Sequence, residues 1–253
     1  GAPEFFSGGG KLIPIEGKNG KMYTEIISHY AQRGVGDVHM SQPQAVSVTQ
    51  ETETGSVYSI TELKAISQIC KTNHLKLHMD GARFANALVS LDCSPAEMTW
   101  KAGVDVLSFG ASKNGAIACE AVVLFDKSMS KEFEFRRKRA GHLFSKMRLL
   151  ASQMETYLED DLWLKNAWHA NQMAKRLHDG LSKIEGIEVP TDIDANILFP
   201  KFPAALTEDL NSQGIEFYSD RWEEGVVRLV TAFDTPENHV DSFIAAVQKH
   251  MDT

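Results

Sequence analysis

Cysteine is scarce in this sequence, and the cysteines that occur lie far apart. The chain has only three, Cys70, Cys93 and Cys119, with no CxxC pair. A disulfide framework or a zinc site needs closely matched cysteines, so these three are predicted to be reduced packing residues. His74 and His78 have the spacing of metal ligands on a helix, but they stand in an alternating segment typical of a strand. We therefore expect no metal site.

An excess of positive charge and a long apolar run are also missing. Lysine and arginine number 26 against 34 acidic residues, a net charge of -8. This balance argues against non-specific binding to nucleic acid or to an anionic membrane, so a small molecule or another protein is the expected partner. No uncharged apolar stretch reaches the roughly 18 residues of a membrane helix, and neither a basic leader nor an apolar signal core opens the chain. The expected location is cytoplasmic.

Hydrophobic residues make up 43% of the 253, which is enough for a real core. In the first half, apolar runs of strand length alternate with helical patterns. This order predicts an α/β fold with a mainly parallel sheet covered on both faces. The predicted strands are 11–15, 45–49, 75–79, 104–109 and 121–125.

Helix signals divide the rest of the chain. Ser59 with Glu62, and Ser94 with Glu97, have the spacing of a capping box at a helix start. Apolar side chains at helical spacing predict one long helix or two joined helices over 130–158, and another over 163–184. Short strands near 187–189, 196–199 and 226–230, and two further helices, are expected to follow. We expect residues 1–150 to form a partial large domain and 151–253 a small α+β domain.

Two loops after predicted strands carry the residues that suggest chemistry. Asp80 follows one strand and Lys113 follows another, 113 − 80 = 33 residues later, about one strand-helix-strand unit. The loops can therefore open on the same edge of the sheet, where such folds bind ligands. A lysine and a carboxylate together suit pyridoxal phosphate (PLP), since the amine forms a Schiff base and the carboxylate keeps the pyridine nitrogen protonated.

Each of these residues also has a plainer interpretation. Lys113 alone suits a solvated loop, and Asp80 suits a turn or a helix N-cap. Arg83 is equally suited to the surface. Arg228 is harder to explain in this way, because it stands between Val227 and Leu229 in a predicted strand, where a charge requires a reason.

The segments around these residues resemble a known family. HMDGARFANA, from His78, and SFGASKNG, which contains Lys113, resemble the L-threonine aldolases of the low-specificity type. VSVTQETETGSVY, RRKRAGHLFSKMRLLASQ and GVVRLVTAFDT follow the same family's order, so the resemblance covers nearly the whole chain. These aldolases are PLP enzymes of fold type I, the aspartate aminotransferase-like class.

The resemblance implies a role for each candidate residue. Lys113 would be the catalytic lysine that holds the cofactor, Asp80 would pair with its pyridinium nitrogen, and Gln50 would lie near it. Arg83 and Arg228 would bind the substrate carboxylate, which agrees with the bidentate geometry of guanidinium. The implied reaction is retro-aldol cleavage of L-threonine or L-allo-threonine to glycine and acetaldehyde. Homodimers or homotetramers are implied too.

Two alternatives stay open. A β-eliminating lyase acting on another amino acid would use the same Lys113 and Asp80, and a non-catalytic remnant would use neither. Family members also carry a segment ahead of the position where this chain begins, with a phosphate-gripping turn and a histidine that stacks on the ring. We therefore expect the chain as given to bind PLP poorly and to be catalytically impaired.

Overall fold

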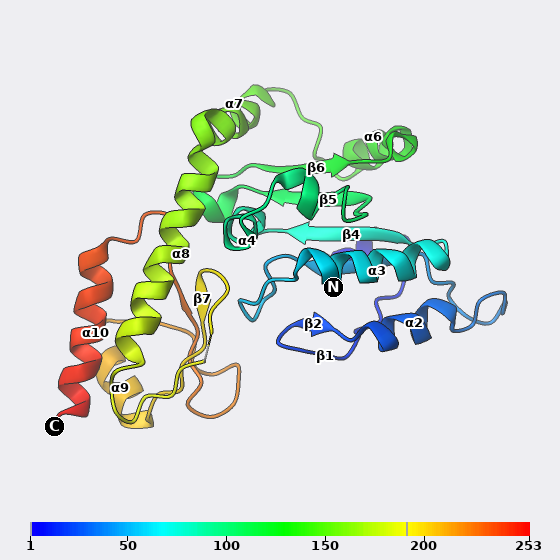
Figure 1. The fold of residues 1–253 in the computed structure, drawn as a ribbon. Coiled ribbons are helices and arrows are strands. Elements are labelled where there is room, and N and C mark those ends of the chain that lie inside the picture. The colour runs from blue at the N-terminus through cyan, green and yellow to red at the C-terminus, as the bar shows by residue number, and fades with distance from the viewer. Residues whose placement is uncertain (1, 191) are drawn as a thin grey trace.

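The computed structural model describes residues 2–190 and 192–253, and its centre is a four-stranded sheet (Figure 1). The strands are β3 (Ala45–Thr49), β4 (Lys76–Gly81), β5 (Val106–Gly110) and β6 (Glu120–Leu124), in the order β3-β4-β5-β6. The first three are parallel and β6 is antiparallel to β5. The predicted α/β fold with a mainly parallel sheet is confirmed, and all four strands lie within two residues of their expected positions.

Helices cover one face of this sheet. α3 (Ile60–Thr72), α4 (Phe84–Leu91) and α5 (Pro95–Met98) follow the strands, and Leu77, Met79 and Leu107 are buried in the same core. On β4 these apolar residues alternate with Lys76, His78 and Asp80, which are exposed or half-buried. The expectation that both faces are covered is therefore wrong for the described residues, because the strand alternates polar and apolar positions.

Both predicted capping boxes are present. The Ser59 hydroxyl accepts a hydrogen bond from the Glu62 N–H at 3.2 Å, and the Glu62 carboxylate accepts one from the Ser59 N–H at 2.7 Å. Ser94 and Glu97 make the same reciprocal pair at the start of α5. Each pair satisfies two backbone donors that a helix start would otherwise leave open.

The predicted strand over 11–15 is wrong. The chain there is irregular, with Leu12 and Ile13 exposed, and Pro14 has no N–H to give a strand ladder. The first ordered elements are instead the short helix α1 (Ala2–Phe6), the hairpin strands β1 (Gly17–Lys18) and β2 (Lys21–Met22), and α2 (Thr24–Gln32). Sequence reasoning missed all four.

The long helical region consists of separate helices. α6 (Ser130–Arg139) and α7 (Arg148–Leu158) are separated by a non-helical stretch that contains Gly141 at a φ of +80°. Two short 3-10 helices, Lys127–Met129 and Glu159–Asp161, flank this region, and α8 (Leu162–Leu181) follows it. The region is helical as predicted, but it is neither one helix nor two joined helices, because residues 140–147 separate α6 from α7.

The C-terminal part is a small α+β unit, as predicted. β7 (Ile197–Leu198) pairs antiparallel with β8 (Leu229–Val230), and α9 (Ala204–Ser212) and α10 (Glu237–Met251) complete it. The strand expected over 187–189 is reduced to a single bridge between Glu188 and Lys201. Within the part of the chain that the structure describes, no helix is both long and apolar enough to cross a bilayer.

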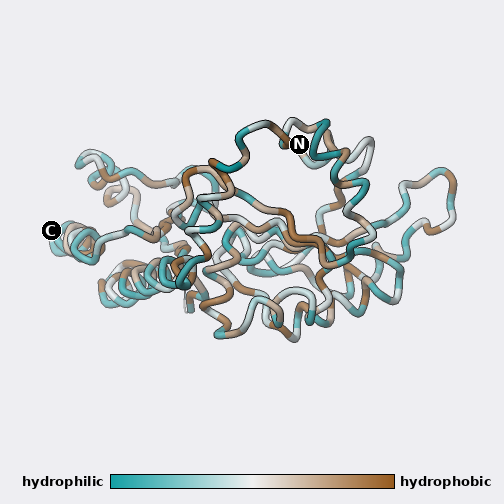
Figure 2. The backbone as a smooth tube through the Cα atoms, turned by 90° about the horizontal axis from the view of Figure 1, so that it is seen from above, coloured by the Kyte–Doolittle hydropathy of each residue, from teal (hydrophilic) through white to brown (hydrophobic). Residues whose placement is uncertain are grey.

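The apolar side chains form two clusters, and α8 contributes to both. Trp163 and Ala167 belong to the core beneath the sheet, whereas Ala174 and Leu181 belong to the core of the C-terminal unit. Apolar segments gather in the middle of the tube in Figure 2, and hydrophilic segments dominate the helices near the C-terminus. α8 therefore ties the two parts together, and the division at residue 150 stays a prediction.

Candidate functional site

The carboxyl ends of β3, β4 and β5 lie side by side at one edge of the sheet. The parallel register places Thr49 beside Asp80 and Asp80 beside Ser108. In Figure 1 the arrows of β4 and β5 point toward α8 and the C-terminal unit, while β6 points the other way, toward α6. Loops from the sheet therefore meet the small unit at these strand ends.

The loops that carry Asp80 and Lys113 touch each other. A Cβ added to Gly110, at the end of β5, would lie 2.8 Å from the Cα of Ala82, in the turn after Asp80. Gly110 therefore permits a backbone approach that a larger residue would block. Three residues further on, Lys113 stands in the 3-10 helix Ser112–Asn114. The predicted convergence of the two loops on one sheet edge is confirmed at the backbone level.

Asp80 holds a turn and keeps one oxygen free. Its Oδ1 accepts a hydrogen bond from the Ala82 N–H at 3.0 Å, and Oδ2 has no partner among the described residues. The N-cap of α4 is Arg83, which makes no side-chain cap bond, so the plainer interpretation of Asp80 as a helix cap is wrong. A half-buried carboxylate with an unused oxygen remains available to a cationic group.

Beside Asp80, a row of polar side chains crosses the face that no helix of the described chain covers. Ser47 Oγ lies 2.8 Å from His78 Nδ1, and His78 Nε2 lies 2.9 Å from Ser108 Oγ. Burial lowers the pKa of His78, against the opposing charge of Asp80. His78 is thus a neutral imidazole fixed between two hydroxyls. It lies in a strand, as its alternating neighbours predicted.

The turn that presents Lys113 is anchored by Asn114. Its Nδ2 donates to the Tyr157 hydroxyl at 2.7 Å and to the Trp163 carbonyl at 2.8 Å, and its own carbonyl accepts from Asn166 Nδ2 at 2.9 Å. Gly115 follows at a φ of +120°, where side chains are strained. Lys113 itself is exposed, and its amine has no hydrogen bond or ion pair within residues 2–190 and 192–253.

We expect Asn114→Ala to lower the free energy of unfolding by about 2–3 kcal/mol, because the Tyr157 hydroxyl and the Trp163 carbonyl lose a buried donor. Chemical denaturation measures the change. Asn211→Ala is the matched control, since Asn211 is an exposed residue of α9, and it should stay within about 0.5 kcal/mol of the parent protein. Equal effects of the two substitutions would contradict the anchoring role.

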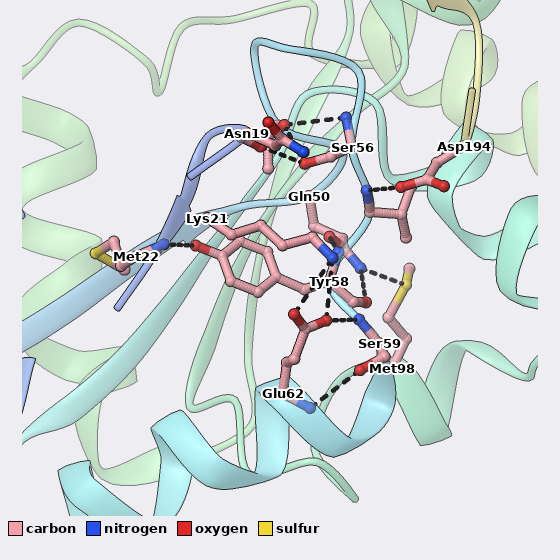
Figure 3. Close-up of polar contacts among 12 residues, drawn as sticks. Asn19, Lys21, Met22, Gln50, Ser56, Tyr58, Ser59, Glu62, Met98 and Asp194 are labelled. Carbon is pink, nitrogen blue, oxygen red and sulfur yellow. Dashed lines mark hydrogen bonds and ion pairs between the residues drawn. The ribbon is translucent and has the colours of Figure 1, made fainter. Parts of the chain in front are cut away.

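Gln50 is turned into the protein interior. Figure 3 shows its amide engaged with Tyr58 and Met98: Oε1 accepts from the Tyr58 N–H at 2.9 Å, and Nε2 donates to the Tyr58 carbonyl at 2.8 Å. The side chain is fully buried. Its side-chain polar atoms thus hold the loop after β3. Its backbone N–H donates to the Asp80 carbonyl at 2.8 Å, and the place of Gln50 near a cofactor stays a prediction.

Two arginines and a glutamate gather next to this edge. Arg83 is 8% exposed at the start of α4, and Arg228 is half-buried beside β8. Burial and the charge of Arg83 both lower the pKa of Arg228, so the two guanidinium groups act on each other. Neither side chain donates a hydrogen bond to the described residues. Two guanidinium groups that influence each other electrostatically and donate no hydrogen bond within the described chain suit a carboxylate ligand.

Sequence reasoning missed Glu51, which belongs to the same cluster. Its side chain is 1% exposed, and neither carboxylate oxygen accepts a hydrogen bond of ordinary geometry from the described residues. Burial raises the pKa of Glu51 to about 8, although Arg83, the Asn196 N–H and Arg228 favour the ionised form. Glu51 therefore carries a proton at neutral pH. No local pattern in the sequence signals that this glutamate is buried.

We expect Glu51→Gln to change how stability depends on pH. The unfolded carboxyl ionises near pH 4.3, whereas the folded one keeps its proton to about pH 8. The folded state binds one more proton in this window, so the parent protein should lose up to about 1.4 kcal/mol of stability per pH unit as pH rises through it. Glu51→Gln removes that loss. Denaturation at pH 5 to 8 measures it, with exposed Glu53→Gln as the control; parallel curves for parent and Glu51→Gln would refute the assignment.

The basic segment after β6 lies elsewhere. Arg136 and Arg139 are exposed on α6 and both pair with Glu132 on the same helix. α6 follows β6, so it lies at the opposite ends of the strands from Asp80 and Lys113 (Figure 1). The structure thus gives these arginines no part in the site at the carboxyl ends of β3 to β5.

A parallel sheet with a lysine and a carboxylate at adjoining strand ends, beside a small α+β unit, is the architecture of the PLP enzymes of fold type I. The family model for beta-eliminating lyases matches residues 1–202. The chain belongs to this family, among its low-specificity L-threonine aldolases.

The relatives support this placement along most of the chain. A low-specificity L-threonine aldolase from a Pseudomonas strain is 43% identical over 99% of this chain and 72% of its own length. Its counterpart in Pseudomonas aeruginosa is 44% identical over 93% of this chain and 67% of its own. The solved threonine aldolase of Leishmania major superposes with a TM-score of 0.88 at 28% identity, covering 97% of this chain and 72% of that one.

Proposed function

We propose that the protein is a PLP-dependent aldolase that cleaves L-threonine and L-allo-threonine to glycine and acetaldehyde. The observation that carries this proposal is the meeting of the Asp80 and Lys113 loops at Ala82 and Gly110, in a chain 43–44% identical to low-specificity L-threonine aldolases. Bound PLP would accept the electron pair released when the Cα–Cβ bond of the substrate breaks.

The available groups fit this cofactor. Lys113 is an exposed amine without an ion partner in the described chain, and it would hold the cofactor covalently through the aldehyde carbon. Asp80 has a free Oδ2 and would keep a proton on the pyridine nitrogen.

Arg83 and Arg228 would bind the substrate carboxylate. Both guanidinium groups lack hydrogen-bond partners within the described chain, and together they can hold a carboxylate in a fixed plane. Fixing the carboxylate fixes the torsion about Cα, which selects the bond that breaks. His78 is held neutral between Ser47 and Ser108, so it would add no positive charge beside Asp80. The Asp80 carboxylate would then stay available to the protonated pyridine nitrogen.

The products test the proposed reaction. We expect the PLP-loaded protein to release glycine and acetaldehyde from L-threonine in equal amounts. Release of 2-oxobutyrate and ammonia instead would point to β-elimination, the alternative that the same lysine and carboxylate permit. Absence of all four products would favour a non-catalytic protein.

We also propose a homodimer or homotetramer in the cytoplasm. Large apolar side chains on and between α6 and α7 are exposed, with Phe135 at 60%, Phe144 at 50% and Leu149 at 63%, and such surfaces suit contact with a second copy. Three unpaired cysteines suit a reducing compartment. Sedimentation of the purified protein tests the assembly, and a monomer at all concentrations would contradict it.

A further inference from the structure

One face of α8 holds two parts of the site that are far apart in the sequence. Asn166 Nδ2 donates a hydrogen bond to the Asn114 carbonyl at 2.9 Å, and so fixes the turn that carries Lys113. One helical turn further on, the Ala170 carbonyl accepts a hydrogen bond from the Thr231 hydroxyl at 2.7 Å. Residues four apart lie on the same face of a helix. The Lys113 turn and the chain that leaves β8 are therefore attached side by side.

The Thr231 hydroxyl is not needed to complete α8. Ala170 lies in the middle of the helix Leu162–Leu181, where a backbone N–H four residues later already serves each carbonyl. The extra bond therefore fixes where β8 lies on the helix. Asn196 holds the same point, since its carbonyl accepts from the Thr231 N–H at 3.1 Å and its Nδ2 donates to the Thr231 carbonyl at 2.6 Å. Both side chains are buried, so bulk water does not replace a lost bond.

Arg228 depends on this attachment because it stands three residues before Thr231. Leu229 and Thr231 are buried on one face of the strand, and Arg228 projects from the opposite face. The Arg228 N–H donates to the Tyr218 carbonyl at 2.9 Å, which holds the strand just before β8. Loss of the Thr231 hydroxyl bond would free the other end of β8, and the Arg228 guanidinium would be less well fixed.

The segment after β8 also touches the Lys113 turn. A Cβ added to Gly115, two residues after Lys113, would lie 3.7 Å from the Phe233 ring. His169 Nε2 lies 2.7 Å from the Thr235 carbonyl, which ties the same segment to α8. The lysine turn and the arginine strand therefore share one short stretch of α8 as their common support.

We propose that Thr231 is a positioning residue that sets where Arg228 lies relative to Lys113. Its hydroxyl bonds to α8 one turn from Asn166, and so fixes the spacing between the amine that would hold the cofactor and the guanidinium that would bind the substrate carboxylate. This inference rests on the proposed function, because it takes Arg228 as a ligand of that carboxylate. Thr231 acts through the strand, so its loss should reach the substrate only by way of Arg228.

Calorimetric titration of the PLP-loaded protein with glycine tests this role without relying on turnover. We expect Thr231→Val to weaken glycine binding about tenfold, which is the cost of misaligning one hydrogen bond to a charged group. Thr231→Ala should do the same without adding a methyl group. Thr231→Ser keeps the hydroxyl and should bind within about twofold of the parent. The absorption of the lysine-bound cofactor should stay unchanged in all three, because Asn166 still holds the Lys113 turn.

Thr99→Val is the matched control for a general loss of stability. Thr99 is also buried, and its hydroxyl donates to the Pro95 carbonyl at 2.6 Å at the end of α5. Its substitution should lower the melting temperature as Thr231→Val does, by about 2–4 °C, and should keep the parent affinity for glycine. Equal losses of affinity in the two variants would overturn the positioning role, and so would a Thr231→Val protein that binds glycine as the parent does.

A double variant separates failure of this role from failure of the proposed function. If Thr231 acts through Arg228, Thr231→Val should cause no further loss of glycine affinity in an Arg228→Ala protein. The same tenfold loss in both backgrounds would overturn the role and leave the aldolase assignment intact. An Arg228→Ala protein that binds glycine as tightly as the parent would contradict the carboxylate site itself, and the role of Thr231 with it.

Discussion

Lys113→Ala should reduce threonine cleavage by roughly a thousandfold or more, because the substitution removes the amine that would hold the cofactor. The visible absorption band of the lysine-bound cofactor should disappear as well. Lys113 is exposed and has no ion partner in the described chain, so the fold should stay intact. Product release, absorption and the circular dichroism of the variant check the three statements together.

Lys127→Ala provides the matched control for this experiment. Lys127 is also exposed and also stands in a 3-10 helix after a strand, but it follows β6 at the opposite edge of the sheet. It should keep the parent absorption and activity. A Lys113→Ala protein that retains both would show that the cofactor is held elsewhere, and would contradict the site at the ends of β4 and β5.

Asp80→Asn should lower activity by roughly a hundredfold or more, since the amide cannot keep the pyridine nitrogen protonated. The asparagine side chain retains an oxygen that can accept from the Ala82 N–H, so the turn after β4 should persist. The expected signature is a lower kcat with the lysine-bound cofactor still present. Absorption spectra and steady-state rates of the PLP-loaded variant measure the two quantities.

Asp92→Asn is the control for the Asp80 variant. Asp92 is an exposed residue in the left-handed region, with a φ of 47°, and asparagine accepts that conformation readily. Activity within a factor of about two of the parent is expected, as for surface substitutions generally. Similar losses for Asp80→Asn and Asp92→Asn would show that net charge matters and the position of Asp80 does not.

Local sequence patterns predicted the sheet well because its strands are encoded locally. Short apolar runs bounded by helix signals located β3 to β6, and the Ser-x-x-Glu spacing located the starts of α3 and α5. The same reasoning failed over 11–15, where an apolar run finds nothing to pack against and Leu12 stays exposed. Burial is a property of the tertiary arrangement, and no short apolar run determines it.

Part of the site was also predictable from local patterns, because two of its residues stand directly after predicted strands. Asp80 and Lys113 each follow a strand, so topology alone brings their loops to one edge. Glu51 gave no signal, because burial arises from the tertiary arrangement, and the arginines that act on its pKa, Arg83 and Arg228, lie 83 − 51 = 32 and 228 − 51 = 177 residues away. The inward turn of Gln50 depends on Tyr58 and was likewise hidden.

Borohydride reduction of the PLP-loaded protein, followed by peptide mass mapping, tests the central assignment most directly. Reduction fixes the cofactor on whichever lysine holds it. We expect a single pyridoxyl group, on the peptide that contains Lys113, and none on that peptide in Lys113→Ala. A modified lysine elsewhere, or no modified lysine in a protein that still cleaves threonine, would contradict the account.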